Sequence, residues 1–255
     1  MTLSHAALLF VAATLAGILN SVAGGGSFIS FPALIFTGVL PIPANATSTV
    51  ALWPGSVASI GGYRRKMPND VRRLAIFAAV SVLGGIAGAV LLLHTPQATF
   101  MHLVSYLFLA ATLLFTFGKS LSDRLGGVAS RRGRPTRLAL GGGTLVLLLI
   151  AVYGGFFGGG IGIMMLALLN VIRMGDIHTM NAVKSLLVAA INGAAVVTFI
   201  LARTVAWPQA TLMLAGAVLG GYGGAHFAQK LDPKVVRRFV IVVGFSMTVY
   251  FLWRY

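Results

Sequence analysis

The chain has 255 residues, of which 58% are apolar and 9% charged, and its mean hydropathy is +0.93. Soluble domains carry about 25% charged residues, so this composition indicates an integral membrane protein whose membrane domain fills the whole length. The absence of cysteine excludes disulfides, thiolate metal sites and cysteine nucleophiles. The net charge of +15 does not indicate nucleic-acid binding, because the basic residues lie in short links between apolar runs, which is the positive-inside pattern of membrane proteins.

A helix that crosses a membrane needs about 20 apolar residues. We expect apolar segments, in chain order, at 5–23, 28–40, 47–63, 71–93, 99–117, 138–157, 161–172, 181–201, 210–228 and 235–253. A polar link rich in Arg and Gly, at 118–137, separates a first membrane repeat (1–117) from a second (138–255). The sequence therefore predicts an all-α polytopic membrane protein with two repeats joined by a basic cytoplasmic linker.

Two glycine-rich stretches interrupt the apolar runs at matching places in the two repeats. They are Gly24-Gly25-Gly26-Ser27 and Gly158-Gly159-Gly160-Ile161. Consecutive glycines weaken a helix, and an open peptide group in hydrocarbon costs several kcal/mol unless protein or water satisfies it. Paired breaks of this kind indicate the binding site of a transporter. The alternative is that these glycines only let helices pack closely.

Other motifs also recur in the same order in the two repeats. Asn45-Ala46 matches Asn181-Ala182, and Gly84-Gly85-x-x-Gly88 matches Gly220-Gly221-x-x-Gly224. Several matches in one order indicate an internal duplication.

The distribution of Lys and Arg favours one topology over another. Lys184 lies inside an apolar segment and is counted on neither side. With four crossings in each repeat, one side of the membrane would carry 13 of the other Lys and Arg residues and the opposite side 5. If each short segment instead pairs with the helix before it, either both crossing or both dipping in and returning, the numbers become 16 and 2. The second arrangement obeys the positive-inside rule far better. It predicts two inverted repeats, each with a Gly-broken helix pair and three transmembrane helices, and places both termini on the outer side of the cell (inner) membrane.

The acidic residues argue against a cationic substrate. All four, Asp70, Asp123, Asp176 and Asp232, lie in links, whereas proton and metal-ion carriers commonly use carboxylates inside the membrane. A cation site built from carbonyl groups is the alternative. The histidines show no metal-ligand spacing, and no nucleotide-binding or hydrolase motif is present. We therefore expect no enzyme activity, no cofactor and no metal site.

The glycine breaks suit an anion instead. A short helix that begins after Gly26 or Gly160 presents free N–H groups and the positive end of its dipole. Lys184 is the only basic residue well inside an apolar segment; it either faces a cavity or extends to the interface. Polar residues that begin the following helices add donors, although ordinary N-capping explains them too. The predicted substrate-binding residues are Gly24, Gly25, Gly26, Ser27, Asn45, Thr47, Ser48, Gly158, Gly159, Gly160, Asn181 and Lys184.

The chain resembles the TauE/SafE sulfite exporter family, also called the 4-toluenesulfonate uptake permease family. The resemblance rests on Ala23-Gly24-Gly25-Gly26-Ser27 with Pro32 and Gly38, Ala44-Asn45-Ala46-Thr47-Ser48, Gly155-Phe156-Phe157-Gly158-Gly159-Gly160 and Asn181-Ala182-Val183-Lys184-Ser185. It covers residues 6–253 and implies a secondary carrier that exports sulfite or an organosulfonate. A channel-like anion pore and a carrier of another sulfur-containing anion are the alternatives. A membrane enzyme or scaffold would need a reactive constellation or a large partner surface, and the sequence shows neither. The expected partners are a small anionic substrate and membrane lipid around the basic linker, with no nucleic acid.

Overall fold

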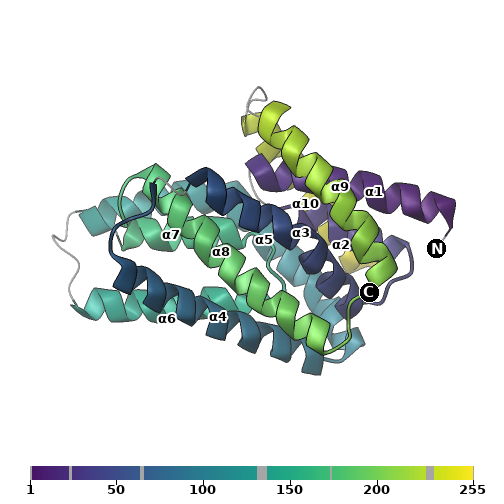
Figure 1. Cartoon of the computed structure of the whole chain (residues 1–255), viewed down its shortest axis with the longest axis horizontal. Coiled ribbons are helices and arrows are strands. Elements are labelled where there is room, and N and C mark those ends of the chain that lie inside the picture. Colours follow the sequence, from purple (N-terminus) through teal and green to yellow (C-terminus); the bar gives the residue numbers. More distant parts are fainter. Residues whose placement is uncertain are drawn as a thin grey trace.

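The computed structural model describes residues 2–22, 25–63, 66–130, 137–172, 174–227 and 233–254. These residues form ten helices and no strand (Figure 1): α1 (Leu3–Val22), α2 (Ser27–Phe36), α3 (Pro41–Tyr63), α4 (Val71–His94), α5 (Gln97–Ser130), α6 (Arg137–Phe156), α7 (Ile161–Val171), α8 (Ile177–Leu201), α9 (Trp207–Phe227) and α10 (Pro233–Arg254). Four of the described helical segments are long and apolar enough to cross a membrane: Leu3–Asn20, Val71–His94, Gln97–Gly118 and Ile177–Leu201. The all-helical class is confirmed.

Both predicted helix breaks are present. α1 ends at Val22 and α2 begins at Ser27, while α6 ends at Phe156 and α7 begins at Ile161. Gly25, Gly158 and Gly160 have φ angles of +96°, +79° and +75°, a left-handed region that side chains with a Cβ rarely adopt. The glycines therefore allow backbone turns that other residues would strain. Gly24 lies outside the described residues.

Most helices begin earlier than the sequence predicts, and α3 and α8 show the largest differences. α3 starts at Pro41 rather than 47, because proline has a φ angle suited to the first helical turn. α8 starts at Ile177 rather than 181, because the Oδ1 atom of Asp176 accepts a hydrogen bond of 2.7 Å from the Thr179 backbone N–H and caps the helix. Asn45, Thr47, Ser48 and Asn181 therefore lie inside helices, and the expectation that they begin helices as N-caps was wrong.

The fifth helix extends beyond the apolar segment expected at 99–117. α5 continues to Ser130, so the segment predicted at 118–137 starts within a helix. Residues 131–136 lie outside the described residues.

The helices of the two repeats interleave. α4 packs against α6 and α8, and α9 packs against α1 and α3. Small residues allow this close approach: a Cβ atom added to Gly88 would overlap the carbonyl oxygen of Val152 in α6, and one added to Gly220 would overlap the carbonyl oxygen of Thr14 in α1. The Gly84–Gly88 motif and its second copy therefore bring helix backbones together, as small residues do at helix contacts in membranes.

A cluster of phenylalanines fills the centre, between the two breaks. It comprises Phe28, Phe31, Phe108, Phe115, Phe157 and Phe251. The ring centroids of Phe28 and Phe108 are 5.3 Å apart and those of Phe108 and Phe157 are 5.5 Å apart. Aromatic pairs of this kind contribute about 0.5–1.5 kcal/mol each beyond the area they bury. This phenylalanine cluster, drawn from α2, α5, α6–α7 and α10, joins the two repeats.

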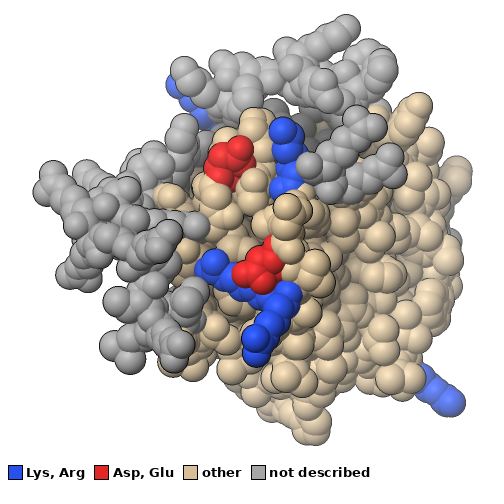
Figure 2. All heavy atoms as spheres, turned by 60° about the vertical axis from the view of Figure 1, so that its left-hand side comes forward, with Lys and Arg blue, Asp and Glu red and all other residues tan. Residues whose placement is uncertain are grey.

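The two ends of the molecule differ in character. In Figure 1 the N- and C-termini lie on the same side, at the right, whereas the ends of α3, α5 and α7 and the starts of α4, α6 and α8 lie at the left. Figure 2 turns the left end forward and shows Lys and Arg side chains close to acidic groups, with a further basic side chain apart from them at the lower right edge. Asp70 and Asp176, which cap α4 and α8, belong to this end.

Candidate functional site

The second break leaves several backbone donors free. The Tyr153 hydroxyl donates a hydrogen bond of 2.6 Å to the carbonyl oxygen of Gly159 and so stabilises the turn between α6 and α7. The N–H groups of Gly159, Gly160 and Gly162 have no hydrogen-bond partner among the described residues. These groups lie at the start of α7, where the helix dipole favours negative charge. Free N–H groups at the start of a helix are the kind of donor that binds small oxyanions in proteins.

Lys184 lies beside this helix start. A Cβ atom added to Gly162 would be 3.8 Å from the Cδ atom of Lys184, so the lysine side chain runs past the first turn of α7. Its Nζ atom donates a hydrogen bond of 2.9 Å to the Oδ1 atom of Asn181, whose own Nδ2 atom donates to the carbonyl oxygen of Ile177. No acidic side chain in the described part of the chain pairs with Lys184. A half-buried ammonium group with one neutral partner keeps most of its charge available to an anion.

At the first break, between α1 and α2, the described backbone groups make more hydrogen bonds with side chains of the protein. The Gly26 N–H, one of the predicted donors, binds the Oδ1 atom of Asn20 at 2.8 Å. The Ser30 hydroxyl donates to the carbonyl oxygen of Gly26 at 3.1 Å and also lies 2.6 Å from the Ser48 hydroxyl. Ser27 is half-buried at the start of α2. The glycine turn at this break is therefore held by the protein's own polar groups.

The polar residues of α3 bind the second repeat. The Asn45 Nδ2 atom donates to the carbonyl oxygen of Phe156 at 3.1 Å, next to the second break. The Thr47 hydroxyl accepts a hydrogen bond of 3.0 Å from the Ala206 N–H. Both side chains are buried. In this structure Asn45, Thr47 and Ser48 make hydrogen bonds within the protein, and their contact with substrate stays a prediction.

The two breaks approach the same helix. A Cβ atom added to Gly25 would lie 2.8 Å from the ring of Phe115, and one added to Gly160 would lie 3.5 Å from Ala111. Ala111 and Phe115 are one turn apart on α5, so they share one face of that helix. The structure therefore brings the described glycines of both breaks to neighbouring turns of α5, with the phenylalanine cluster between them.

Three residues at the site were not singled out from the sequence: Tyr153, Ser30 and Gly162. Tyr153 precedes the glycines by a little over one helical turn, and a hydroxyl so close to a break in an apolar segment is the signal that could have identified it. Ser30 and Gly162 gave no comparable signal.

Two broken helices in a helical membrane protein, with N–H groups at one break that have no partner among the described residues and a lysine beside them, are typical of a transporter binding site. Comparison with known proteins also identifies the chain as a transporter. The chain matches the family model described as Sulfite exporter TauE/SafE over residues 9–251, so it belongs to the TauE/SafE family, and the resemblance noted from its motifs is confirmed.

Similar proteins carry transporter names without a stated substrate. The chain is 29% identical over 243 residues to a "Probable membrane transporter protein" of Haemophilus influenzae, a match covering 95% of this chain and 92% of the relative. It is 28% identical over 250 residues to "Probable membrane transporter protein YfcA" of Escherichia coli (strain K12), covering 96% and 89%. No solved structure matches the chain. The protein is a membrane transporter of the TauE/SafE family.

Proposed function

We propose that this protein is a secondary carrier that exports a small anion, sulfite or an organosulfonate, across the cell membrane by alternating access. The proposal rests mainly on the position of Lys184. Its side chain lies beside N–H groups at the start of α7 that have no partner among the described residues. A cationic side chain together with free backbone donors matches the charge and the hydrogen-bonding needs of a sulfonate or sulfite oxygen. The name of the family supports the same class of anion.

The two repeats contribute different side chains to the proposed anion site. By the repeat alignment, Asn45 corresponds to Asn181, and Ser48 therefore corresponds to Lys184. Ser48 is hydrogen-bonded to Ser30, whereas Lys184 is bonded to a single amide oxygen. We place the charge-binding part of the site in the second repeat. The first break and Ser27 then form the other wall of the pathway.

The packing of helices supports a duplication whose two copies are related by a two-fold axis. α1 packs on α9 as α6 packs on α4, and α3 packs on α9 as α8 packs on α4. In the repeat alignment α1 corresponds to α6, α3 to α8 and α4 to α9. Replacing each helix by its counterpart turns one member of each pair of contacts into the other, as a two-fold relation between repeats requires. The termini on one side of the molecule in Figure 1 agree with the predicted outer location of both ends.

The packing between the two repeats suggests which groups of helices move as rigid bodies during transport. We infer that one bundle contains α1, α2, α3 and α9 and that the other contains α4, α6, α7 and α8, with the contact between α3 and α8 lying at their boundary. Alternating access would arise as these bundles rock against each other around the breaks. The hydrogen bonds from Asn45 to Phe156 and from the Trp53 indole to the Ala189 carbonyl, 3.1 and 3.0 Å long, join the two bundles and would change during that motion.

Flux measured in liposomes tests the proposal. Purified protein in vesicles loaded with unlabelled sulfite should accumulate labelled sulfite transiently by counterflow, and the rate should saturate with concentration. Flux without counterflow or saturation would indicate an anion pore. Counterflow of sulfate or thiosulfate but neither sulfite nor an organosulfonate would identify a carrier of another sulfur-containing anion.

A further inference from the structure

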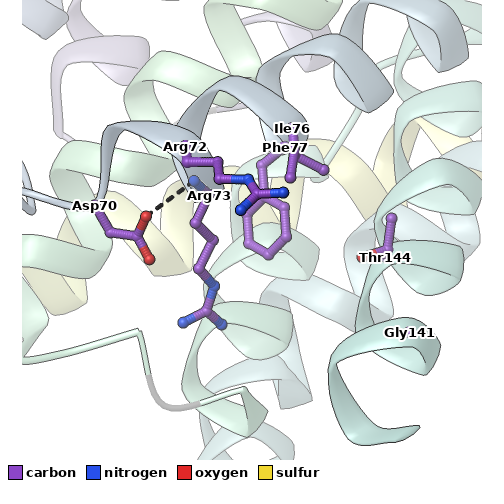
Figure 3. A pocket seen from close by; sticks show the side chains of 7 residues that line it. All are labelled: Asp70, Arg72, Arg73, Ile76, Phe77, Gly141 and Thr144. Carbon is purple, nitrogen blue, oxygen red and sulfur yellow. Dashed lines mark hydrogen bonds between the residues drawn. The ribbon is translucent and has the colours of Figure 1, made fainter. Parts of the chain in front are cut away.

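A surface hollow of about 300 Å³ lies between the first two turns of α4 and those of α6 (Figure 3), and no residue of the glycine breaks lines it. Asp70, Arg72, Arg73, Ile76 and Phe77 line it from α4 and the residue that caps that helix, and Gly141 and Thr144 line it from α6. The hollow belongs to the end of the molecule at which charged side chains gather in Figure 2. It combines two guanidinium groups, one carboxylate and an apolar wall.

Two of the three nitrogen atoms of the Arg73 guanidinium lack a hydrogen-bond partner among the described residues. Its Nε and Nη2 atoms are buried and make no hydrogen bond with any described residue. The group lies 5.3 Å from the centre of the Phe77 ring, a cation–π contact that offsets only part of the lost hydration. A buried charged donor without an acceptor is unfavourable. An oxyanion in the hollow would supply an acceptor in a charge-assisted hydrogen bond once the Arg73 side chain turns its buried nitrogen atoms toward the hollow.

The one acid in the hollow does not neutralise the arginines. The Oδ1 atom of Asp70 accepts a hydrogen bond of 3.1 Å from the backbone N–H of Arg73, which caps α4. Neither Arg72 nor Arg73 forms an ion pair with a carboxylate in the described part of the chain. The charged groups that line the hollow therefore leave an excess of positive charge, and Arg72 is exposed where it can meet a ligand.

The surroundings favour a ligand with an apolar tail. Ile76 forms part of the wall and is 48% exposed, and the same two helices expose further apolar side chains in later turns, Leu83 in α4 and Leu145 and Leu149 in α6. A phosphate carried by a phospholipid would place its oxygens beside the arginines and its acyl chains along this surface. Basic pockets between membrane helices bind anionic headgroups in this manner. A free phosphate ion would use only the arginines.

We propose that the hollow between α4 and α6 binds the phosphate of a phospholipid headgroup through Arg72 and Arg73. The site is separate from the anion pathway at the glycine breaks and uses none of its residues.

Binding of three probes to the full-length protein in detergent tests the site: dioleoylphosphatidylglycerol, dioleoylglycerol with the same acyl chains but no phosphate, and inorganic phosphate. Arg73→Gln removes the charge. Gly141→Leu fills the hollow while keeping both arginines, because a Cβ atom at Gly141 meets open space. Gly142→Leu is its matched control, since that position is equally open but does not line the hollow. Arg203→Gln, exposed in the link after α8, is the control for loss of charge.

The proposal predicts that phosphatidylglycerol binds more tightly than dioleoylglycerol, and that Arg73→Gln and Gly141→Leu each weaken its binding about tenfold or more, since a hydrogen bond to a charged group is worth that factor. Gly142→Leu and Arg203→Gln should leave it unchanged. Equal binding of the two lipids, or an equal loss in Gly142→Leu, would overturn the site. If inorganic phosphate bound as tightly as the lipid, with the same dependence on Arg73, the proposal of a phospholipid ligand would be refuted, because the site would bind free phosphate. None of these results depends on transport.

Discussion

Substitution of Gly88 by alanine tests whether the two repeats are held together by direct contact of their helix backbones. A Cβ atom at this position would overlap the carbonyl oxygen of Val152 and would lie 2.7 Å from the backbone nitrogen of Phe156. Backbone atoms cannot move aside by rotating a side chain, so α4 and α6 must separate. Gly142 is the matched control, because it lies in α6 with no atom within 4 Å of its added Cβ.

The expected size of the effect follows from two opposing terms. Overpacking costs about 1–3 kcal/mol, and the cost should fall near the upper end because the obstacle is backbone. Alanine regains up to about 1 kcal/mol of helix propensity over glycine. Gly88→Ala should therefore lower the free energy of unfolding by about 1–2 kcal/mol, whereas Gly142→Ala should leave it unchanged or raise it by up to about 1 kcal/mol.

Reversible unfolding by sodium dodecyl sulfate in mixed micelles, followed by far-ultraviolet circular dichroism, measures this difference. Gly220→Ala, which meets the carbonyl oxygen of Thr14 in α1, should behave like Gly88→Ala. If Gly88→Ala proved as stable as Gly142→Ala, the close approach of α4 and α6 would be refuted.

Three further predictions concern single side chains. Asn45→Leu leaves the Phe156 carbonyl without its donor and should lower the unfolding free energy by about 1–3 kcal/mol in the same titration; an unchanged midpoint would show that this bond does not hold the bundles together. Tyr153→Phe removes the hydroxyl bonded to Gly159 and should cost about 1 kcal/mol, and full stability would argue against its role at the turn. The backbone N–H of Thr179 holds the pKa of Asp176 below its ordinary value, so the stabilisation by this carboxylate is present at neutral pH and is lost as the pH falls through the folded-state pKa. Asp176→Asn, which keeps a capping side chain, should weaken the loss of stability in acid, and an acid profile identical to that of the unsubstituted protein would contradict this.

The number and order of the helices could be predicted from the sequence, since apolar segments of membrane length and runs of glycine are local signals. The breaks at Gly25–Gly26 and Gly158–Gly160 are clear for this reason. The helix starts were harder to place. Pro41 begins α3 and Asp176 caps α8 before the apolar runs become evident, so Asn45 and Asn181 were placed at helix starts rather than inside the helices.

The interleaving of the repeats could not be predicted, because it depends on contacts between residues far apart in the chain. Gly84-Gly85-x-x-Gly88 and its copy were recognised as a repeat, but nothing local shows that α4 packs on α6 and that α9 packs on α1. For the same reason the sequence could not predict that Asn45 binds the backbone of Phe156 and that Thr47 binds the backbone of Ala206. The substrate-binding role of the predicted residues remains a proposal, supported most strongly at the start of α7.

The most direct test of the account is sulfite counterflow in proteoliposomes that contain Lys184→Met or Lys184→Arg. Met has a similar length without the charge, and Arg keeps the charge. The account predicts that Lys184→Met lowers transport efficiency about tenfold or more, because a charge-assisted hydrogen bond to the anion is lost, and that Lys184→Arg retains much more activity. Equal counterflow by the unsubstituted protein and Lys184→Met, with both correctly folded, would contradict the placement of the anion site at the start of α7.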